Sequence, residues 1–443
     1  MYKTSFTILF SSLFLLSCTP GFSGQTNSLG KSVLVQRPSK DAASIIARDL
    51  TFQNDERISY CEVLSTDNNT YSGYRDQKLY PLASLSKIIT TAWALKKLGP
   101  DHTIESTWYF KPVNEQAGVF DAYLKTNYDP VFNIEKILYS LSLMQSAGIY
   151  QIRNLIIDET TRIYLSATTQ PHIELDQIPI SSSESVQNLR LILNSENWSS
   201  QTQAAKQRLL TWAAKNKKNV NIPAKFSVEK VEFKSSDEIA VNSYTKKINL
   251  KSASLLKYLK NLNVYSNNYI SDVLFWYLGG LHDFRKFQIS ELELTDTELQ
   301  LFTGSGLADA TTGIRKDNLG TCTAMLKILN YIDLIAQKNG LNLGHFLYNP
   351  TQDLDGTFES KLNFTNQVVI KTGRLFEKPA LNVAGIASTN KGSLYFAFLG
   401  HDFSPDEAAD IEIARDKMLK SALGFYPAKN SFLTLDDYQI FLK

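Results

Sequence analysis

The chain has 443 residues, of which 43% are hydrophobic and 20% charged, so it can bury a core and has room for two or three domains. Its formal net charge of +2 gives no support for nucleic-acid binding. The five histidines show no metal-ligand spacing, and no G-x-S-x-G sequence occurs, which argues against a metal enzyme and a Ser-His-Asp hydrolase.

The first residues are typical of an export signal. Lys3 supplies a positive charge, and the apolar stretch from Phe6 to Leu16 is too short to span a bilayer. The sequence then reaches Cys18 through a stretch similar to a bacterial lipoprotein signal, so we predict that Cys18 is lipidated. Cleavage by the ordinary signal peptidase before Gln25 is the alternative. The protein is expected to be exported, to reside in the periplasm, and to contact a bacterial membrane only through this anchor.

Two β-rich segments precede the first helix. Arg57 to Ser65 and Tyr71 to Tyr80 are aromatic and β-branched, and Asp67-Asn68-Asn69 separates them, which predicts a β-hairpin. A helix is expected from Ser84, because apolar residues then recur at helical spacing, and Gly99-Pro100 should end it.

Residues 103–246 have a different character and are predicted to form an α+β insertion domain. Its expected elements are strands within Thr107–Tyr123, a helix capped by Asn133 and ended by Gly148, a strand at Leu155–Ile157, a polar loop over 180–203, a helix over Thr202–Lys217 and a strand over Lys225–Phe233. Five basic residues of this insertion are interpreted as one solvated helix face, with weak attraction to anionic wall polymer or lipid as the alternative. They are Lys206, Arg208, Lys215, Lys217 and Lys218.

Helices return after residue 247, and strands follow them. The expected elements are a helix over Leu255–Leu262, a helix from Ser266 to Gly279-Gly280, a helix over Asp317–Ala336, strands at Val368–Lys371, Asn382–Ser388 and Leu394–Leu399, and a last helix opened by the capping box Ser404-Pro405-Asp406-Glu407 and closed by Gly424. Strands at both ends of the chain with helices between them predict an antiparallel sheet covered by helices.

Two cysteines remain beyond the signal. Cys61 and Cys322 could pair in an oxidising compartment. They lie far apart in sequence, in a strand-like and a helix-like segment, so two separate buried thiols are the favoured interpretation.

Ser84 and Lys87 form the first of three motifs that carry candidate chemistry. They stand three positions apart and share one face of the expected helix, so the lysine can take the proton of the serine. A lysine desolvated beside a second cation, here Lys371, can be neutral near pH 7 and act as this base. Considered alone, the pair is better explained by a helix cap and a surface lysine, since such a spacing arises by chance in a chain of this length.

Ser266 and Asn268 form the second motif, two positions apart at a helix start. Ser266 is expected to relay a proton between Lys87 and a leaving amine, and Asn268 to hold both Lys87 and a substrate carbonyl. An N-cap or a turn is the structural alternative for this motif.

The third motif, Lys371-Thr372-Gly373, follows an apolar run. Lys371 and Thr372 are expected to bind a substrate carboxylate, and Gly373 to let the substrate backbone approach. The amide of Arg374 is expected to join that of Ser84 as an oxyanion donor. A lysine that deters edge pairing is the alternative. The order of the three motifs, and their expected settings, favour serine acyl transfer without histidine.

These motifs and their surroundings resemble the D-alanyl-D-alanine carboxypeptidase/endopeptidase family of the penicillin-binding protein 4 type, peptidase S13, in the serine β-lactamase/DD-peptidase superfamily. The resemblance covers most of residues 40–425. The segments that carry the resemblance are Pro81-Leu82-Ala83-Ser84-Leu85-Ser86-Lys87, Leu98-Gly99-Pro100-Asp101, Tyr265-Ser266-Asn267-Asn268-Tyr269-Ile270-Ser271-Asp272, Gly304-Ser305-Gly306-Leu307, Asp355-Gly356-Thr357 and Lys371-Thr372-Gly373.

The resemblance implies an α/β (α+β) fold of the β-lactamase/DD-peptidase type, an antiparallel sheet flanked by helices, with the α+β insertion domain between the first two motifs. The expected division is a signal at 1–18, a tether at 19–35, a discontinuous catalytic domain at 36–102 and 247–443, and the insertion at 103–246.

The implied function is that of a serine-type D-Ala-D-Ala carboxypeptidase, with DD-endopeptidase activity as a further option. It would act on peptidoglycan stem peptides through an acyl-enzyme on Ser84, without metal or cofactor, and β-lactam antibiotics would acylate the same serine. A serine β-lactamase, and a non-catalytic peptidoglycan-binding lipoprotein of the same fold, remain alternatives.

The sequence departs from the family pattern in places that affect substrate selection. Thr303 stands where the family usually has Asp, and an extra stretch near Ala308–Ile314 comes after it. The insertion also lacks a Trp- and Pro-rich segment after the strand that ends at Asp158. By analogy Asp158 could approach a diamino acid of the substrate, but a structural aspartate at a strand end is the favoured interpretation.

Overall fold

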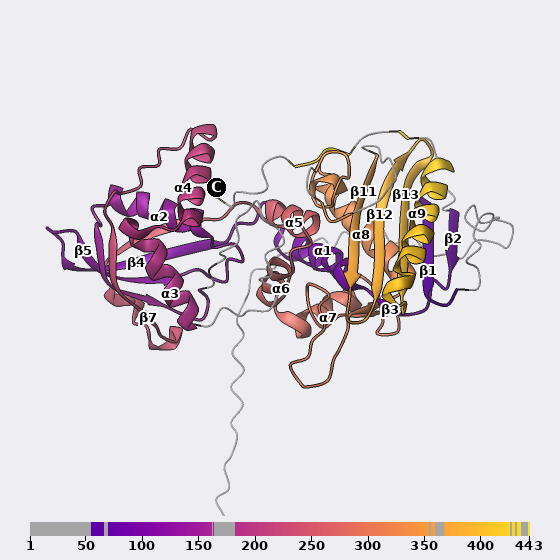
Figure 1. Ribbon diagram of the computed structural model, residues 1–443, viewed down its shortest axis with the longest axis horizontal. Coiled ribbons are helices and arrows are strands. Elements are labelled where there is room, and N and C mark those ends of the chain that lie inside the picture. The colour runs from indigo at the N-terminus through magenta and orange to yellow at the C-terminus, as the bar shows by residue number, and fades with distance from the viewer. Residues whose placement is uncertain are drawn as a thin grey trace, which may run out of the picture.

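The computed structural model describes residues 55–65, 70–161, 163, 182–353, 356–358, 367–425, 428–429, 432–435 and 442–443. The predicted signal, the tether, Cys18 and the Asp67-Asn68-Asn69 turn lie outside these residues. The described chain forms two lobes, each built on its own sheet (Figure 1).

The larger lobe contains a five-stranded antiparallel sheet in the order β11-β12-β13-β1-β2. Its strands are β1 (Ile58–Ser65), β2 (Thr70–Tyr74), β11 (Val368–Leu375), β12 (Ala380–Thr389) and β13 (Gly392–His401). The first strand pairs with the last, with Cys61 opposite Ala397, so the two halves of the chain meet in one sheet. This arrangement confirms the antiparallel sheet predicted from strands at both ends.

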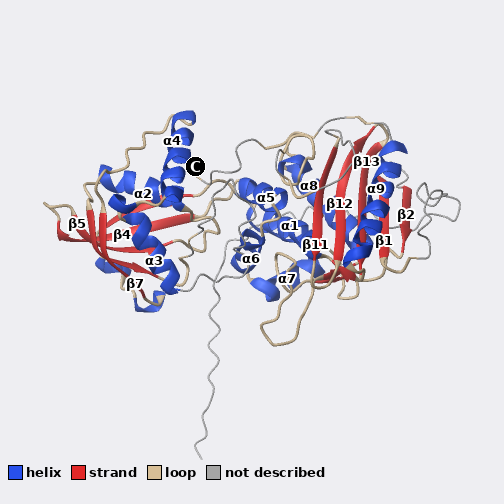
Figure 2. Cartoon of the chain, in the orientation of Figure 1, coloured by secondary structure: helices blue, strands red, loops and turns tan. Residues whose placement is uncertain are grey.

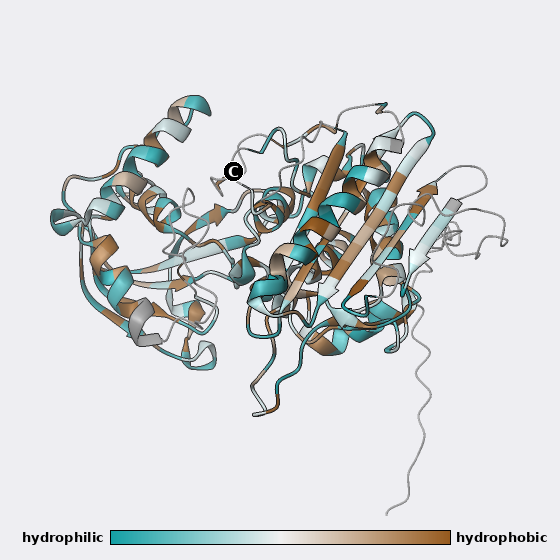
Figure 3. Cartoon of the chain, turned by 45° about the vertical axis from the view of Figure 1, so that its right-hand side comes forward, coloured by the Kyte–Doolittle hydropathy of each residue, from teal (hydrophilic) through white to brown (hydrophobic). Residues whose placement is uncertain are grey.

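Helices cover both faces of this sheet (Figure 2). Alternate residues of β13 point to opposite faces, as the pleat requires. Ala397 and Leu399 pack in the core that contains α8 (Cys322–Lys338), whereas Phe396 and Phe398 pack with α9 (Ala408–Phe425). The hydrophobic runs of the strands are visible as brown bands between the helices (Figure 3).

The centre of this lobe is α1 (Ser86–Leu98), which follows a 3-10 turn, η2 (Ala83–Leu85). Every residue from Ser86 to Leu95 is buried, which fits a helix at the middle of a core rather than on a surface. Other elements beside it are α5 (Leu255–Val264), α6 (Asn268–Tyr277), α7 (Gly280–Ser290) and a small sheet of β3 (Tyr80–Pro81), β10 (Leu319–Gly320) and β9 (Leu299–Gln300).

The second lobe is a mixed sheet in the order β7-β6-β5-β4-β8, with helices packed on it. Its strands are β4 (Glu105–Asn114), β5 (Val119–Lys125), β6 (Gln151–Ile157), β7 (Ser227–Phe233) and β8 (Lys246–Lys251), and its helices are α2 (Ile134–Ser146), α3 (Ser182–Leu193) and α4 (Ser200–Lys215). A separate core around Trp108, Phe120 and Leu138 fills it. The boundary predicted between residues 246 and 247 falls inside β8, so the sheet extends to Lys251.

The remaining elements are short 3-10 turns: η3 (Ser195–Asn197), η4 (Ser236–Glu238), η5 (Val241–Ser243), η6 (Leu343–His345) and η7 (Pro405–Glu407). The capping box predicted at Ser404 is present at η7, directly before α9.

Two local predictions were wrong. The polar stretch over 180–203 is not a loop, because α3 occupies its centre and buries Leu189, Ile192 and Leu193 despite the surrounding serines and asparagines. The helix expected from Asp317 begins only at Cys322, where the Thr321 hydroxyl caps it by accepting the Ala324 amide at 3.1 Å, and the residues before it form β10.

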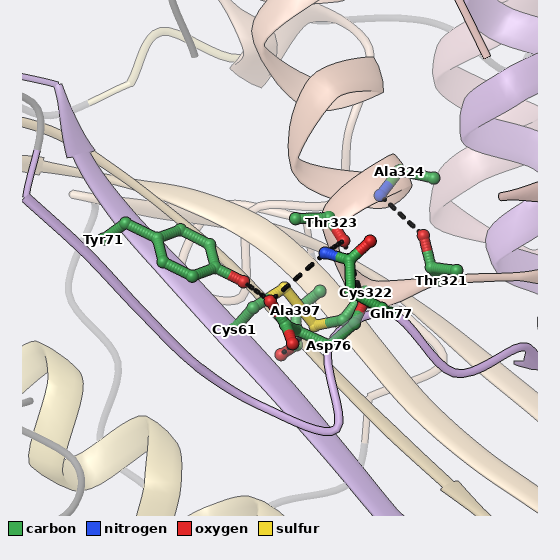
Figure 4. Close-up of a disulfide and its surroundings, with 9 residues drawn as sticks. All are labelled: Cys61, Tyr71, Asp76, Gln77, Thr321, Cys322, Thr323, Ala324 and Ala397. Carbon is green, nitrogen blue, oxygen red and sulfur yellow. Dashed lines mark hydrogen bonds between the residues drawn. A yellow bond between two sulfur atoms is a disulfide. The ribbon is translucent and has the colours of Figure 1, made fainter. Parts of the chain in front are cut away.

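Cys61 and Cys322 are joined in a disulfide, contrary to the favoured prediction of separate thiols (Figure 4). The bond connects β1 to the first residue of α8 and has a Cα–Cα distance of 5.9 Å. The sequence separation of 261 residues hid the pairing, since only the tertiary fold brings the two segments together. Nearby, Thr323 Oγ1 donates to Asp76 O at 2.8 Å, which ties the same helix end to the segment after β2.

Candidate active site

Ser84 lies on the strained turn that precedes α1. Ala83 adopts φ +50°, a left-handed conformation that costs a non-glycine residue roughly 1 kcal/mol, and the surrounding structure must hold it. Asn382 of β12 does so by donating to Pro81 O at 2.8 Å and Leu82 O at 3.0 Å. Ala83 and Leu85 are buried whereas Ser84 is partly exposed, so the turn presents this one hydroxyl to solvent.

Lys87 is completely buried directly behind the hydroxyl. Its Nζ lies 2.8 Å from Ser84 Oγ, 2.5 Å from Asn268 Oδ1 and 2.8 Å from Ser305 O. All three oxygens accept a hydrogen bond from Nζ, which suits the ammonium form. Loss of the proton that faces Ser84 would leave a lone pair directed at the serine hydroxyl, so Lys87 is placed to act as a general base. Burial excludes the alternative of a surface lysine.

Ser266 and Asn268 flank the residue that caps α6. The Asn267 side chain accepts the Ile270 amide at 3.0 Å, so the cap is made by the residue between the two predicted site residues. Ser266 itself has φ +55°, in the sharp bend between α5 and α6. The cap expected as the structural alternative for Ser266 and Asn268 is thus supplied by Asn267.

Lys371 is the second fully buried lysine of the site. Its Nζ donates to Ser266 Oγ at 3.0 Å and to Thr372 O at 2.8 Å. Burial, followed by repulsion from Lys87, lowers the pKa of Lys371 well below its ordinary value. The sequence suggested that Lys371 in turn lowers the pKa of Lys87, and that effect stays a prediction.

The third motif lies within β11, two residues short of its end, rather than at the strand terminus. β11 is the edge strand of the sheet, but Lys371 is buried, so it is not an exposed lysine that deters edge pairing. A Cβ on Gly373 would lie 2.7 Å from Leu82 O and 3.1 Å from Leu85 N, so this strand touches the serine turn backbone to backbone. The close contact places the Arg374 and Ser84 amides on adjoining segments, and their oxyanion role stays a prediction.

Two threonine hydroxyls meet beside this strand. Thr357 Oγ1 lies 2.8 Å from Thr372 Oγ1, and both residues are partly exposed. The Arg374 side chain is exposed and lies over the Phe376 ring at 5.0 Å. The hydroxyl pair rather than the Arg374 guanidinium is therefore the polar surface next to Lys371.

Two asparagines that support the site were not predicted from the sequence. One is Asn382, which holds the serine turn. The other is Asn318, whose Nδ2 donates to Ser86 Oγ at 3.0 Å and to Thr303 O at 2.8 Å, and whose Oδ1 accepts the Phe302 amide at 2.8 Å. A lone Asn in the apolar run of β12 was a usable signal for Asn382, whereas Asn318 gave none.

Asp158 fits the structural interpretation. It is 1% exposed, and it accepts hydrogen bonds from Tyr123 Oη at 2.5 Å and from the Thr160 amide at 2.9 Å. The five basic residues expected to form one solvated helix face do not share a helix, because Lys217 and Lys218 follow the end of α4 and the partly exposed Arg208 pairs with the buried Glu135 at 2.8 Å.

Among the described residues, no group of three or more His, Cys, Asp or Glu side chains is placed to hold a metal ion. Over the same residues, no helix combines the length and the apolar character that crossing a membrane requires.

Comparisons with known proteins agree with this geometry. The model of the D-Ala-D-Ala carboxypeptidase 3 (S13) family matches residues 46–177 and 239–422, which is more than half of the chain. A search of curated proteins found no match.

Solved structures extend the comparison to the fold. The predatory endopeptidase Bd0816 of Bdellovibrio bacteriovorus is 26% identical with a TM-score of 0.74, covering 85% of this chain and 96% of its own. The predatory peptidoglycan endopeptidase Bd3459 of the same organism is 25% identical with a TM-score of 0.72, covering 87% and 98%. Penicillin-binding protein 4 of Haemophilus influenzae, at 17% identity and a TM-score of 0.53 over 85% and 98%, shares the fold. The chain therefore belongs to the D-Ala-D-Ala carboxypeptidase 3 (S13) family and is a serine peptidase with the β-lactamase/DD-peptidase fold.

Proposed function

We propose that this protein hydrolyses the bond after a D-alanine in peptidoglycan stem peptides, as a D-Ala-D-Ala carboxypeptidase that uses an acyl-enzyme on Ser84. The observation that carries the proposal is the meeting of three distant segments. Ser84, Lys87 and Asn268 share one hydrogen-bonded cluster, and Lys371 contacts Ser266 beside it.

The residues supply each proton that the reaction needs. Ser84 Oγ attacks the carbonyl carbon between the two D-alanines while Lys87 Nζ takes its proton. The C–N bond then breaks, and the proton held by Lys87 passes through Ser266 to the departing amine, which restores neutral Lys87; Ser266 also contacts Lys371. Water next attacks the ester, returns a proton to Ser84 and releases the shortened peptide.

The free carboxylate of the substrate would lie against Lys371 and Thr372. Burial lowers the pKa of Lys371, and an arriving carboxylate would oppose that shift, because the opposite charge favours the ammonium form. Thr357 Oγ1 and Thr372 Oγ1 lie 2.8 Å apart, so this end of the site can offer two hydroxyls to one carboxylate.

Endopeptidase activity is a second candidate, since two relatives with at least 25% identity are named as endopeptidases. Both reactions break the same kind of bond, and they differ in the group that carries the scissile nitrogen. The test is to incubate the protein with a stem pentapeptide and, separately, with a cross-linked muropeptide dimer, and to monitor both by mass spectrometry. Release of D-alanine supports the carboxypeptidase, and conversion of dimer to monomers supports the endopeptidase. Failure of both refutes the proposal.

A β-lactamase would need a base that activates water for rapid deacylation. In the described residues the Ser84 hydroxyl contacts a lysine rather than a carboxylate, which favours a long-lived penicillin adduct. The intact cluster likewise argues against a non-catalytic binding protein. A steady release of hydrolysed penicillin over many turnovers would favour the β-lactamase instead.

We further propose an exported protein held at a bacterial membrane by a lipid on Cys18. The Cys61–Cys322 disulfide supports export, because such bonds persist in oxidising compartments. The Cys18→Ala variant should move from the membrane fraction to the soluble periplasmic fraction. An unchanged distribution would refute the anchor.

A further inference from the structure

The turn Thr303–Gly306 contacts the reacting lysine. Ser305 O accepts a hydrogen bond from Lys87 Nζ at 2.8 Å, and the Ser305 amide donates to Asp272 Oδ1 at 2.7 Å. The backbone of a single residue therefore stands between a carboxylate and the lysine that faces Ser84.

This turn is fixed in place from both sides. Gly304 O accepts hydrogen bonds from Thr90 Oγ1 at 2.9 Å and from Ser271 Oγ at 2.8 Å. A Cβ on Gly304 would lie 2.5 Å from Ser271 O, and one on Gly306, which has φ +92°, would lie 1.8 Å from Ala83 O. The turn is thus packed without spare space between α6 and the serine turn, and displacement of its backbone would displace Lys87.

Asp272 also contributes charge. It lies four residues after Asn268, so both side chains project from the same face of α6 toward Lys87. Burial raises the pKa of Asp272, and hydrogen bonds from Ser305 together with the charge of Lys87 oppose that rise. Two ionisable groups that act on Lys87 are Asp272 from α6 and Lys371 from β11, and the Thr303–Gly306 turn itself carries no ionisable side chain.

We propose that Asp272 is a positioning residue, which acts through Ser305 to hold Lys87 against Ser84 and whose negative charge sets the pH above which Lys87 accepts the serine proton. The proposal rests on the proposed function of Lys87 as the base. In this proposal the Gly304-Ser305-Gly306 turn couples the position of the Asp272 carboxylate on α6 to the position of Lys87 on α1.

The test is the pH dependence of acylation by a fluorescent penicillin, measured as a second-order rate constant in the full chain. Asp272→Asn keeps an oxygen that can accept the Ser305 amide but removes the charge. Because a carboxylate nearby favours the ammonium form, its loss should move the acid limb of the profile toward lower pH by about one unit. Asp272→Glu keeps the charge, so its acid limb should stay at the wild-type pH while the maximal rate falls.

Asp283→Asn on α7 is the matched control, since it removes a carboxylate that pairs with Lys97 and Lys286 at the surface. Its profile should coincide with that of the wild type. An Asp272→Asn profile that keeps the wild-type acid limb, or moves it toward higher pH, overturns the proposal. Should Asp272→Asn fail to fold, an Asp272→Glu acid limb displaced by one unit overturns it equally. If the wild type is not labelled at all, the proposed function fails instead.

Discussion

Replacing Gly373 by alanine tests whether β11 and the serine turn form one catalytic unit. The new Cβ would lie 2.7 Å from Leu82 O and 3.1 Å from Leu85 N, and both of these atoms belong to backbone that cannot rotate away. The shorter contact falls about 0.7 Å inside ordinary van der Waals distance, so β11 and the turn must separate by a comparable amount. Since a 1 Å misplacement can cost a reaction about 10²-fold, acylation of Ser84 should slow by roughly tenfold or more.

The assay is the second-order rate of labelling by fluorescent penicillin, with thermal unfolding measured on the same samples. Gly424→Ala is the matched control, because nothing lies within 4 Å of its Cβ and it stands near the end of α9. Alanine is the better helix former by up to about 1 kcal/mol, so the control should label at the wild-type rate and unfold at the same or a slightly higher temperature.

A Gly373→Ala protein that labels as fast as the wild type would contradict this prediction, since it would mean that the strand and the turn need not touch. A variant that labels slowly but unfolds at the wild-type temperature would locate the defect at the reacting groups. Equal losses in folding and labelling would instead show that the contact serves the fold as a whole.

Three other perturbations separate stability from chemistry. Burial lowers the pKa of Lys371 in the folded protein. At pH values between that lowered pKa and the ordinary value of about 10.4, the unfolded chain binds more protons than the folded chain, so the wild-type free energy of unfolding should rise with pH. Lys371→Met removes that rise and should be more stable near pH 7, by about 1–2 kcal/mol in urea unfolding, while losing acylation; a variant less stable than the wild type would count against this expectation. Replacing Cys61 and Cys322 together by alanine should lower the free energy of unfolding by about 2–5 kcal/mol yet preserve labelling at 25 °C, and equal stability would show that the disulfide is not formed. Asp158→Ala leaves the Tyr123 hydroxyl and the Thr160 amide without their acceptor, so it should cost about 1–3 kcal/mol and leave the KM for stem peptides unchanged; a raised KM with normal stability would support substrate contact instead.

The sequence was a good guide wherever a local pattern carried the information. The strands at the two ends of the chain, the cap at Asn133 and the capping box at Ser404 all occur as predicted. Helical periodicity did not predict α3, because its apolar residues have helical spacing but are few in a mostly polar segment. The start of α8 was misplaced for a different reason, because Leu319 and Gly320 form β10 through pairing with distant strands that local sequence does not encode.

The sequence predicted the candidate reacting residues of the site but not the residues that hold them in place. Motif order was enough to predict that the three motifs come together: Lys87 contacts Ser84, Lys371 contacts Ser266, and the charge of Lys87 acts on Lys371. The residues that hold these groups in place, Asn318 and Asn382, interact over distances of up to 301 residues along the chain. Such contacts, like the Cys61–Cys322 bond, arise only after the fold is formed. The pKa of Lys371 was likewise out of reach, since it depends on complete burial beside another lysine.

The most direct measurement is intact-mass spectrometry of the protein after exposure to penicillin, for the wild type and for Ser84→Ala. If the Ser84 hydroxyl alone receives the acyl group, the wild type should gain the mass of one penicillin and the variant none. An adduct of equal extent on both proteins would place the reaction elsewhere and remove Ser84 from its role as the nucleophile.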